Sequence, residues 1–61
     1  MKLVRVEARH FVAAFITDGT VRIAAPILKR LIGETDDTAR KVIAHFRWKA
    51  TVIDEWDQTI Y

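Results

Sequence analysis

The sequence predicts a small α+β domain, a three-stranded, mainly antiparallel sheet with two short helices on one face. Three observations predict it. Residues 11–24 carry a β-hairpin signal, a proline opens a helical pattern directly afterwards, and an alternating segment returns near residues 48–53. The chain has 61 residues, which suits a single domain over 1–61. A chain of this length buries only about 60% of the surface that its unfolded form exposes.

Apolar residues alternate with other residues along positions 3–16. The even positions are apolar except for His10, and the odd positions Arg5, Glu7 and Arg9 are charged. A period of two is typical of a half-buried strand. Because the run exceeds a usual strand of about 5–6 residues, it indicates either one bent strand or two strands joined near Arg9 and His10.

The pair Asp18-Gly19 is a strong signal for a two-residue type I′ turn, in which both central residues have positive φ. This turn predicts that Thr17 lies opposite Thr20 and that Phe15 lies opposite Arg22. One face of the hairpin would then be apolar and would form the core. That face carries Val12, Ala14, Ile16, Val21, Ile23 and Ala25.

Two helices are expected after the hairpin. Pro26 suits the first turn of a helix, and Gly33 is typical of the residue that ends one. Thr35 or Asp36 can cap the second helix at its N-terminus. Helical spacing then places four apolar residues on one stripe, namely Ala39, Val42, Ile43 and Phe46.

The spacing of the two helices places Phe46 against Leu31 in the core. A last strand is expected near 48–53, and residues 54–61 have no clear period, which is typical of a frayed tail. Trp56 lies within this tail. It is either tucked against the sheet or part of a short recognition segment together with its acidic neighbours Asp54, Glu55 and Asp57.

Composition argues against most kinds of active site. The chain has no Ser, Cys or Asn, so the usual nucleophilic triads cannot form. Gly19 and Gly33 are the only glycines, which excludes a glycine-rich phosphate loop. The two histidines, His10 and His45, are too few and too far apart to suggest a metal site. We therefore expect a protein that is not an enzyme, with no cofactor and no metal.

Charge and hydropathy restrict the partner and the compartment. The net charge of +2 permits a nucleic-acid partner without requiring one. No apolar run approaches the roughly 18 residues of a membrane span, and the first ten residues alternate apolar with charged positions, unlike a signal peptide. The lack of cysteine fits the bacterial cytoplasm, which is the expected location.

Five motifs follow one another along the chain: the segment 11–14, Asp18-Gly19, the "AAPIL" helix start at 24–28, Gly33 and Trp48. In this order they resemble the motifs of a group of very small, uncharacterised proteins of bacteriophage and prophage genomes. The resemblance implies a mobile-element origin and carries no catalytic residue. Two departures from the pattern are Arg47, where glycine is expected before the tryptophan, and Ala14, where glycine is common.

The face opposite the expected core is the candidate partner-binding site. It would carry Arg5, Arg9, Phe11, Phe15 and Arg22. Aromatic and arginine side chains are enriched at protein interfaces, so a host protein or a second copy of the chain is the favoured partner. An inhibitor or adaptor acting on a host complex, for example an anti-CRISPR protein, would suit the implied origin. Alternatively, the aromatic rings could stack on nucleic-acid bases while the arginines bind phosphates, or the protein could be a self-associating structural piece.

Overall fold

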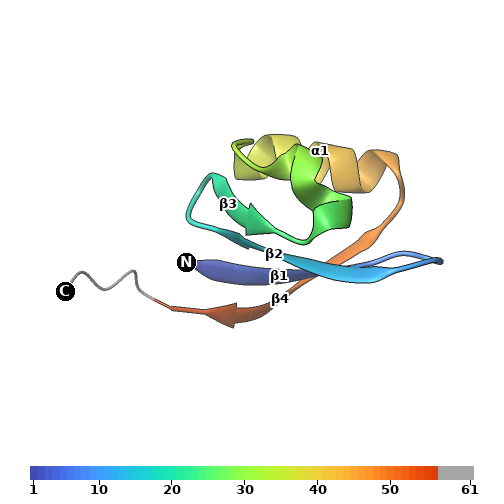
Figure 1. Cartoon of the computed structure of the whole chain (residues 1–61), viewed down its shortest axis with the longest axis horizontal. Coiled ribbons are helices and arrows are strands. Elements are labelled where there is room, and N and C mark those ends of the chain that lie inside the picture. The colour runs from blue at the N-terminus through green and yellow to red at the C-terminus, as the bar shows by residue number, and fades with distance from the viewer. Residues whose placement is uncertain (57–61) are drawn as a thin grey trace.

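The computed structural model describes residues 1–56 (Figure 1). The α+β class is confirmed, but the sheet has four strands where three were expected. All neighbouring strands are antiparallel, and their order is β3-β2-β1-β4. The strands are β1 (Lys2–Glu7), β2 (Val12–Thr17), β3 (Val21–Ala24) and β4 (Lys49–Glu55).

The fourth strand arises because the alternating run 3–16 is two strands rather than one. A tight loop joins β1 to β2, and within it the Ala8 N–H donates to the Phe11 carbonyl oxygen (2.9 Å). β1 pairs with β2 on one side and with β4 on the other. Of the two alternatives for this run, the structure has two strands joined near Arg9 and His10, and β1 is a central strand of the sheet.

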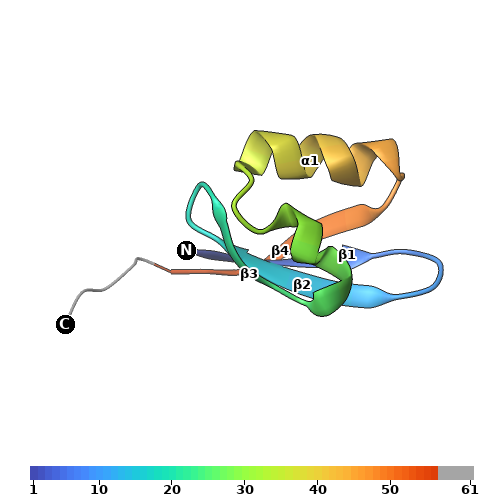
Figure 2. The same ribbon diagram turned by 45° about the horizontal axis from the view of Figure 1, so that its top comes forward.

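Both helical segments lie on one face of the sheet (Figure 2). The first, η1 (Pro26–Leu31), is a 3-10 helix, so only the second, α1 (Asp36–His45), is an α-helix. Thr35 is the N-cap of α1, and its hydroxyl oxygen accepts a hydrogen bond from the Thr38 N–H (3.3 Å). Of the two cap residues expected from the sequence, the structure uses Thr35.

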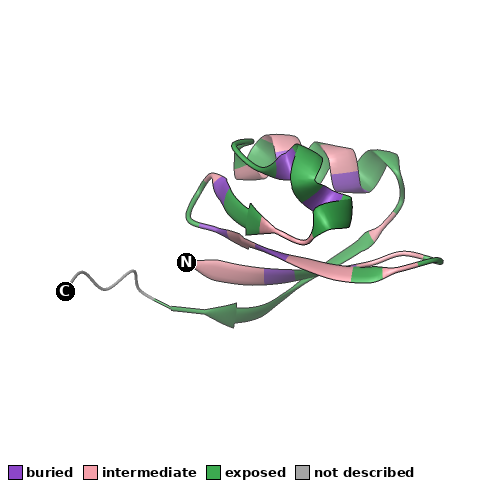
Figure 3. Cartoon of the chain, viewed as in Figure 1, coloured by how far each residue is buried: buried purple, intermediate pink, exposed green. Residues whose placement is uncertain are grey.

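The core lies between the sheet and the two helical segments (Figure 3). Leu31 is buried there as expected, but Phe46 is 46% exposed and the expected contact between the two in the core is wrong. Phe46 lies just beyond α1, as its C-cap residue. The buried apolar residues are Val4, Val6, Phe15, Val21, Leu28, Leu31, Ala39 and Ile43.

The predicted register of the second hairpin is also wrong. Three residues, 18–20, separate β2 from β3, and Thr17 is aligned with Val21 rather than with Thr20. The register shifts between Ile16 and Thr17, so the hairpin contains an irregularity that a type I′ turn lacks. Gly19 has positive φ (109°), whereas Asp18 does not, and the type I′ assignment requires both.

The two faces of β2 are the reverse of the prediction. Phe15, expected to face outward, is 5% exposed and is aligned with Ala24 instead of Arg22. Val12 and Ile23, expected in the core, are 67% and 63% exposed. The apolar face of β2 that was predicted as core is therefore the face that the helices leave uncovered.

The first two residues of the expected tail belong to the sheet. Asp54 and Glu55 are the last residues of β4. Trp56 and Met1 then exchange two hydrogen bonds, from the Trp56 N–H to the Met1 carbonyl (2.9 Å) and from the Met1 amino group to the Trp56 carbonyl (2.8 Å). Asp57 and the rest of the expected tail lie outside the described residues. Within residues 1–56, no helix is both long and apolar enough to cross a membrane.

Candidate functional site

The structure separates the aromatic and basic residues of the predicted site. Phe15 belongs to the core, and Phe11 is partly buried against that core. The Phe11 ring meets the Trp48 ring edge-on, with centroids 5.1 Å apart and planes at 81°. Neither phenylalanine therefore lies on the face away from the helices, and their expected grouping with the arginines is wrong. Whether any of these residues binds a partner stays a prediction.

Two of the three predicted arginines are paired with carboxylates. Arg5 forms an ion pair with Glu7 on the same strand. The Arg22 Nε donates to Asp18 Oδ1 (3.0 Å), and this hydrogen bond is the main cause that lowers the pKa of Asp18 below its ordinary value. Arg9 is exposed in the loop between β1 and β2. The positive charge of Arg5 and of Arg22 is thus partly neutralised within the chain.

A different set of residues gathers on the face that the helices leave uncovered. Strand register aligns Leu3 with Ile16, and Ile16 with Ile23, so these three residues form an apolar row across β1, β2 and β3. None of them belongs to the buried core. Along β2, the period of two adds Val12 and Ala14 to the same face. We call this surface the outer patch: Leu3, Val12, Ala14, Ile16 and Ile23.

Sequence reasoning missed the outer patch, although its signal was present. Val12, Ala14 and Ile16 share one face of β2, and Ala13, Phe15 and Thr17 share the other. Both faces are largely apolar. A strand with two apolar faces indicates that either both sides are covered or one side is an exposed apolar surface.

A groove of about 190 Å³ lies between α1 and the strands β1, β2 and β4. Its wall is mainly apolar, and its polar residues are Lys2, Thr17, Asp36 and Arg40. Small-molecule pockets usually measure about 300–1,000 Å³, so the groove is too small to be a typical ligand site. It exists because α1 covers the centre of the sheet and leaves every residue of β4 exposed.

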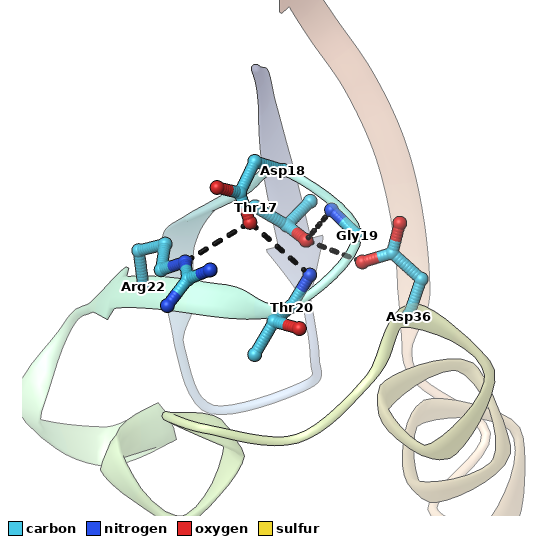
Figure 4. A network of polar contacts seen from close by, with 6 residues as sticks. All are labelled: Thr17, Asp18, Gly19, Thr20, Arg22 and Asp36. Atoms are coloured by element: carbon cyan, nitrogen blue, oxygen red, sulfur yellow. Dashed lines mark hydrogen bonds and ion pairs between the residues drawn. The ribbon is translucent and has the colours of Figure 1, made fainter.

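A polar network joins the hairpin loop to the start of α1 (Figure 4). The Thr17 hydroxyl donates to Asp36 Oδ1 and accepts a hydrogen bond from the Gly19 N–H (3.2 Å). Among the described residues, no buried side-chain nitrogen or oxygen lacks a hydrogen-bond partner. In the same part of the chain, no group of three His, Cys, Asp or Glu side chains could hold a metal ion. The network therefore connects the hairpin loop to the start of α1.

An aromatic cluster covers the C-terminal end of α1. The Phe46 ring stacks on Trp48 with centroids 4.7 Å apart and planes at 15°. The Arg30 guanidinium lies 5.8 Å from the centroid of the Phe46 ring, and the His45 ring meets it edge-on. Three neighbouring groups of the same chain thus contact Phe46, so its exposed ring is already used in internal packing.

Arg47, the departure from the glycine pattern, has the backbone conformation that favours glycine. Its φ is 59°, in the left-handed region. The Trp48 N–H donates to the Ile43 carbonyl (3.0 Å) and the Arg47 N–H donates to the Ala44 carbonyl (3.1 Å). These two bonds make a Schellman motif, in which the residue at the position of Arg47 is usually glycine.

Comparison of the chain with protein-family models, with curated proteins and with solved structures found no match.

Proposed function

We propose that this protein is a non-enzymatic interaction module whose outer patch binds an apolar surface of a host protein in the bacterial cytoplasm. The observation that supports it is the uncovered apolar row Leu3–Ile16–Ile23 on a sheet whose other face is covered by helices. Large exposed apolar patches on small domains mark interaction sites. An inhibitor or adaptor role is the finer form of this proposal and rests on the resemblance to small phage proteins.

The charges near the outer patch favour a protein partner over nucleic acid. Arg5 is paired with Glu7 and Arg22 with Asp18, so neither presents an uncompensated charge to phosphates. Sheet surfaces that bind single strands also use exposed aromatic rings as stacking platforms. The outer patch has only aliphatic side chains, and apolar aliphatic surface is better matched by another apolar surface.

The test compares two substitutions of matched chemistry on opposite sides of the molecule. Ile23→Asp places a charge in the outer patch, at a residue that is 63% exposed. Ile27→Asp is the control, because Ile27 is 54% exposed but belongs to η1. Both variants and the parent are immobilised and exposed to nuclease-treated bacterial lysate, and circular dichroism checks that all three fold.

The proposal expects one partner protein that the parent and Ile27→Asp retain and that Ile23→Asp loses. The identified partner is then purified and titrated against all three proteins. If the purified partner binds Ile23→Asp as tightly as the parent, the outer patch is not its binding site. If binding depends on nucleic acid that the nuclease removes, the nucleic-acid alternative replaces the proposal.

A further inference from the structure

β4 is an open edge of the sheet over all seven of its residues. It is the last strand in the order β3-β2-β1-β4, and its only strand partner in the described part of the chain is β1 (Figure 1). An open edge presents backbone N–H and C=O groups that can pair with another strand. The middle of β4, residues 50–53, contains no charge and no proline, which are two of the features with which proteins protect such edges. Its pairing with β1 is interrupted only by one register shift, between Val52 and Asp54.

The opposite edge of the sheet is protected in this chain. β3 has only four residues and is followed within two residues by Pro26. Its first residue, Val21, donates to the Glu34 carbonyl and accepts from the Gly33 N–H, both at 2.8 Å. The segment that leads into α1 therefore covers the start of β3. Among the described residues, the β4 edge is therefore the longer and the less protected of the two.

The charges at the two ends of β4 are opposite, so two copies of the strand have complementary charges when they pair antiparallel. Lys49 is its first residue, and Asp54 and Glu55 are its last two. In a parallel pair of two β4 strands, like charges would meet at both ends. In an antiparallel pair, each lysine meets the acidic end of the other copy. We propose that two copies of this chain form a dimer by antiparallel pairing of their β4 strands.

The alternation of side chains selects the register of this pair. Ala50 and Val52 line the groove on the helix side, and residues that lie opposite each other in a sheet share a face. A two-fold axis at Thr51 pairs Ala50 with Val52 of the second copy. It also places Lys49 opposite Ile53 and beside Asp54 of that copy. A two-fold axis at Val52 would instead place Asp54 opposite Ala50, although the register shift in β4 aligns Asp54 with Leu3, on the other face of the sheet from Ala50.

The resulting dimer has one continuous eight-stranded sheet, because each copy contributes four strands. Pairing at the edge leaves the outer patch of both copies uncovered and places the two patches on the same side of the sheet. The dimer therefore does not depend on the proposed function, and either can be wrong while the other holds.

The register can be tested by a disulfide, since the chain contains no cysteine. In Thr51→Cys the two thiols would lie directly opposite each other. Opposite residues in an antiparallel pair have Cα atoms about 4.5–5.5 Å apart, within the range of about 4.4–6.8 Å that a disulfide needs. Lys41→Cys, on the exposed side of α1, is the control for random collisions. Mild oxidation should cross-link Thr51→Cys rapidly and Lys41→Cys slowly.

The charge pairing can be tested by mixing two variants. Lys49→Glu makes both ends of the strand acidic, and Asp54→Lys cancels the net negative charge of the C-terminal end, so each should raise the dimer dissociation constant by on the order of tenfold. When the two variants are mixed, glutamate meets lysine at one end and lysine meets aspartate at the other. The mixture should therefore form a heterodimer about as tight as the parent dimer. Lys41→Glu is the control for a change of net charge alone.

Sedimentation equilibrium of the parent over a concentration series decides the outcome together with these variants. A parent dimer, a fast Thr51→Cys cross-link and rescue on mixing would support the proposal. A parent that is monomeric at every concentration would overturn it. A dimer without the Thr51→Cys cross-link would also overturn it and would favour a different dimer, in which two outer patches pack face to face. That packing holds the two sheets about 10 Å apart, which is too far for a disulfide. If Lys49→Glu fails to fold beside Glu7, its cross-strand neighbour, the cross-link alone decides.

Discussion

The Thr17 hydroxyl donates a hydrogen bond to the Asp36 carboxylate and so ties the last residue of β2 to the first residue of α1. The Thr17 side chain is 2% exposed, and the same hydroxyl oxygen accepts a hydrogen bond from the Gly19 N–H. The Asp36 N–H in turn donates to the Gly19 carbonyl (3.1 Å). One threonine thus holds the hairpin loop against the start of the helix.

Replacing Thr17 by valine should lower the free energy of unfolding by about 1–3 kcal/mol. Valine keeps the shape of threonine but leaves the Asp36 carboxylate and the Gly19 N–H without this partner. Urea unfolding followed by circular dichroism measures the loss. Thr51→Val is the matched control, because Thr51 is exposed on β4 and is in no side-chain hydrogen bond of the network. Equal stabilities for the two variants would contradict the role given to Thr17.

Replacing Arg47 by glycine should raise the free energy of unfolding by roughly 0.5–1 kcal/mol. Arg47 has φ 59°, where a residue with a Cβ is strained and glycine is not. Lys41→Gly is the control, because it also replaces a long basic side chain by glycine but does so within α1. It should lower the free energy of unfolding by about 1 kcal/mol. Thermal unfolding of both variants checks the prediction. If both variants melt below the parent, the left-handed conformation of Arg47 does not strain the chain.

Replacing Phe15 by alanine should lower the free energy of unfolding by about 3–5 kcal/mol, because a core ring would leave a cavity. This result would reverse the expectation from the sequence, which placed Phe15 on an outward face. Ile23→Ala, at a 63% exposed residue of the next strand, should cost less than about 1 kcal/mol. The two variants are compared by chemical unfolding, and similar losses would show that the faces of the hairpin are assigned incorrectly.

Replacing Arg22 by alanine should raise the pKa of Asp18 towards its ordinary value. The hydrogen bond from Arg22 is the main cause that lowers this pKa, and the Thr20 N–H lowers it further. The carboxyl ¹³C shift of Asp18, followed by NMR from neutral to acidic pH, measures the pKa in the parent and in the variant. A pKa that does not move would show that Arg22 is not the cause.

The hydrogen-bonded pair of Arg22 and Asp18 also predicts how the stability of the fold changes with pH. Because the folded-state pKa is lowered, the contribution of Asp18 to stability is present above the pKa of unfolded aspartate. It is lost as the pH falls through the lowered, folded-state pKa. The difference in stability between the parent and Asp18→Asn should therefore shrink on acidification. A difference that grows as the pH falls would contradict the assignment.

The length of the loop between β1 and β2 explains why the sequence analysis predicted the wrong core face of β2. The even residues Val4 and Val6 of β1 point into the core, as expected. Four residues, 8–11, connect β1 to β2, so the strand register joins Val4 to Phe15 and Val6 to Ala13. An even residue of β1 thus lies beside an odd residue of β2. Alternation shows which residues of one strand share a face. It does not show which face of the next strand is on the same side of the sheet, because that depends on the number of residues in the connecting turn.

Local signals elsewhere predicted the elements correctly. Pro26 starts a helical segment, Thr35 caps α1, and the last strand, Lys49–Glu55, overlaps the expected 48–53. The strand order was not predictable, because no local pattern records which strand pairs with the far side of β1. The two apolar faces of β2 could be recognised in the sequence, but the central row of the outer patch could not, because it depends on how three strands are aligned.

The position of β1 between β2 and β4 also affects how the chain is made. β2 follows β1 after a short loop, whereas β4 begins only at Lys49. Pairing between segments so distant in sequence is slow to form, and during translation it must wait until the ribosome has delivered β4. β1 is therefore the first strand of this sheet to be synthesised, and its pairing with β4 is the last strand pairing that can form. A ribosome that stalls before Lys49 would release a nascent chain with the middle of its sheet unpaired, a substrate for chaperones and proteases.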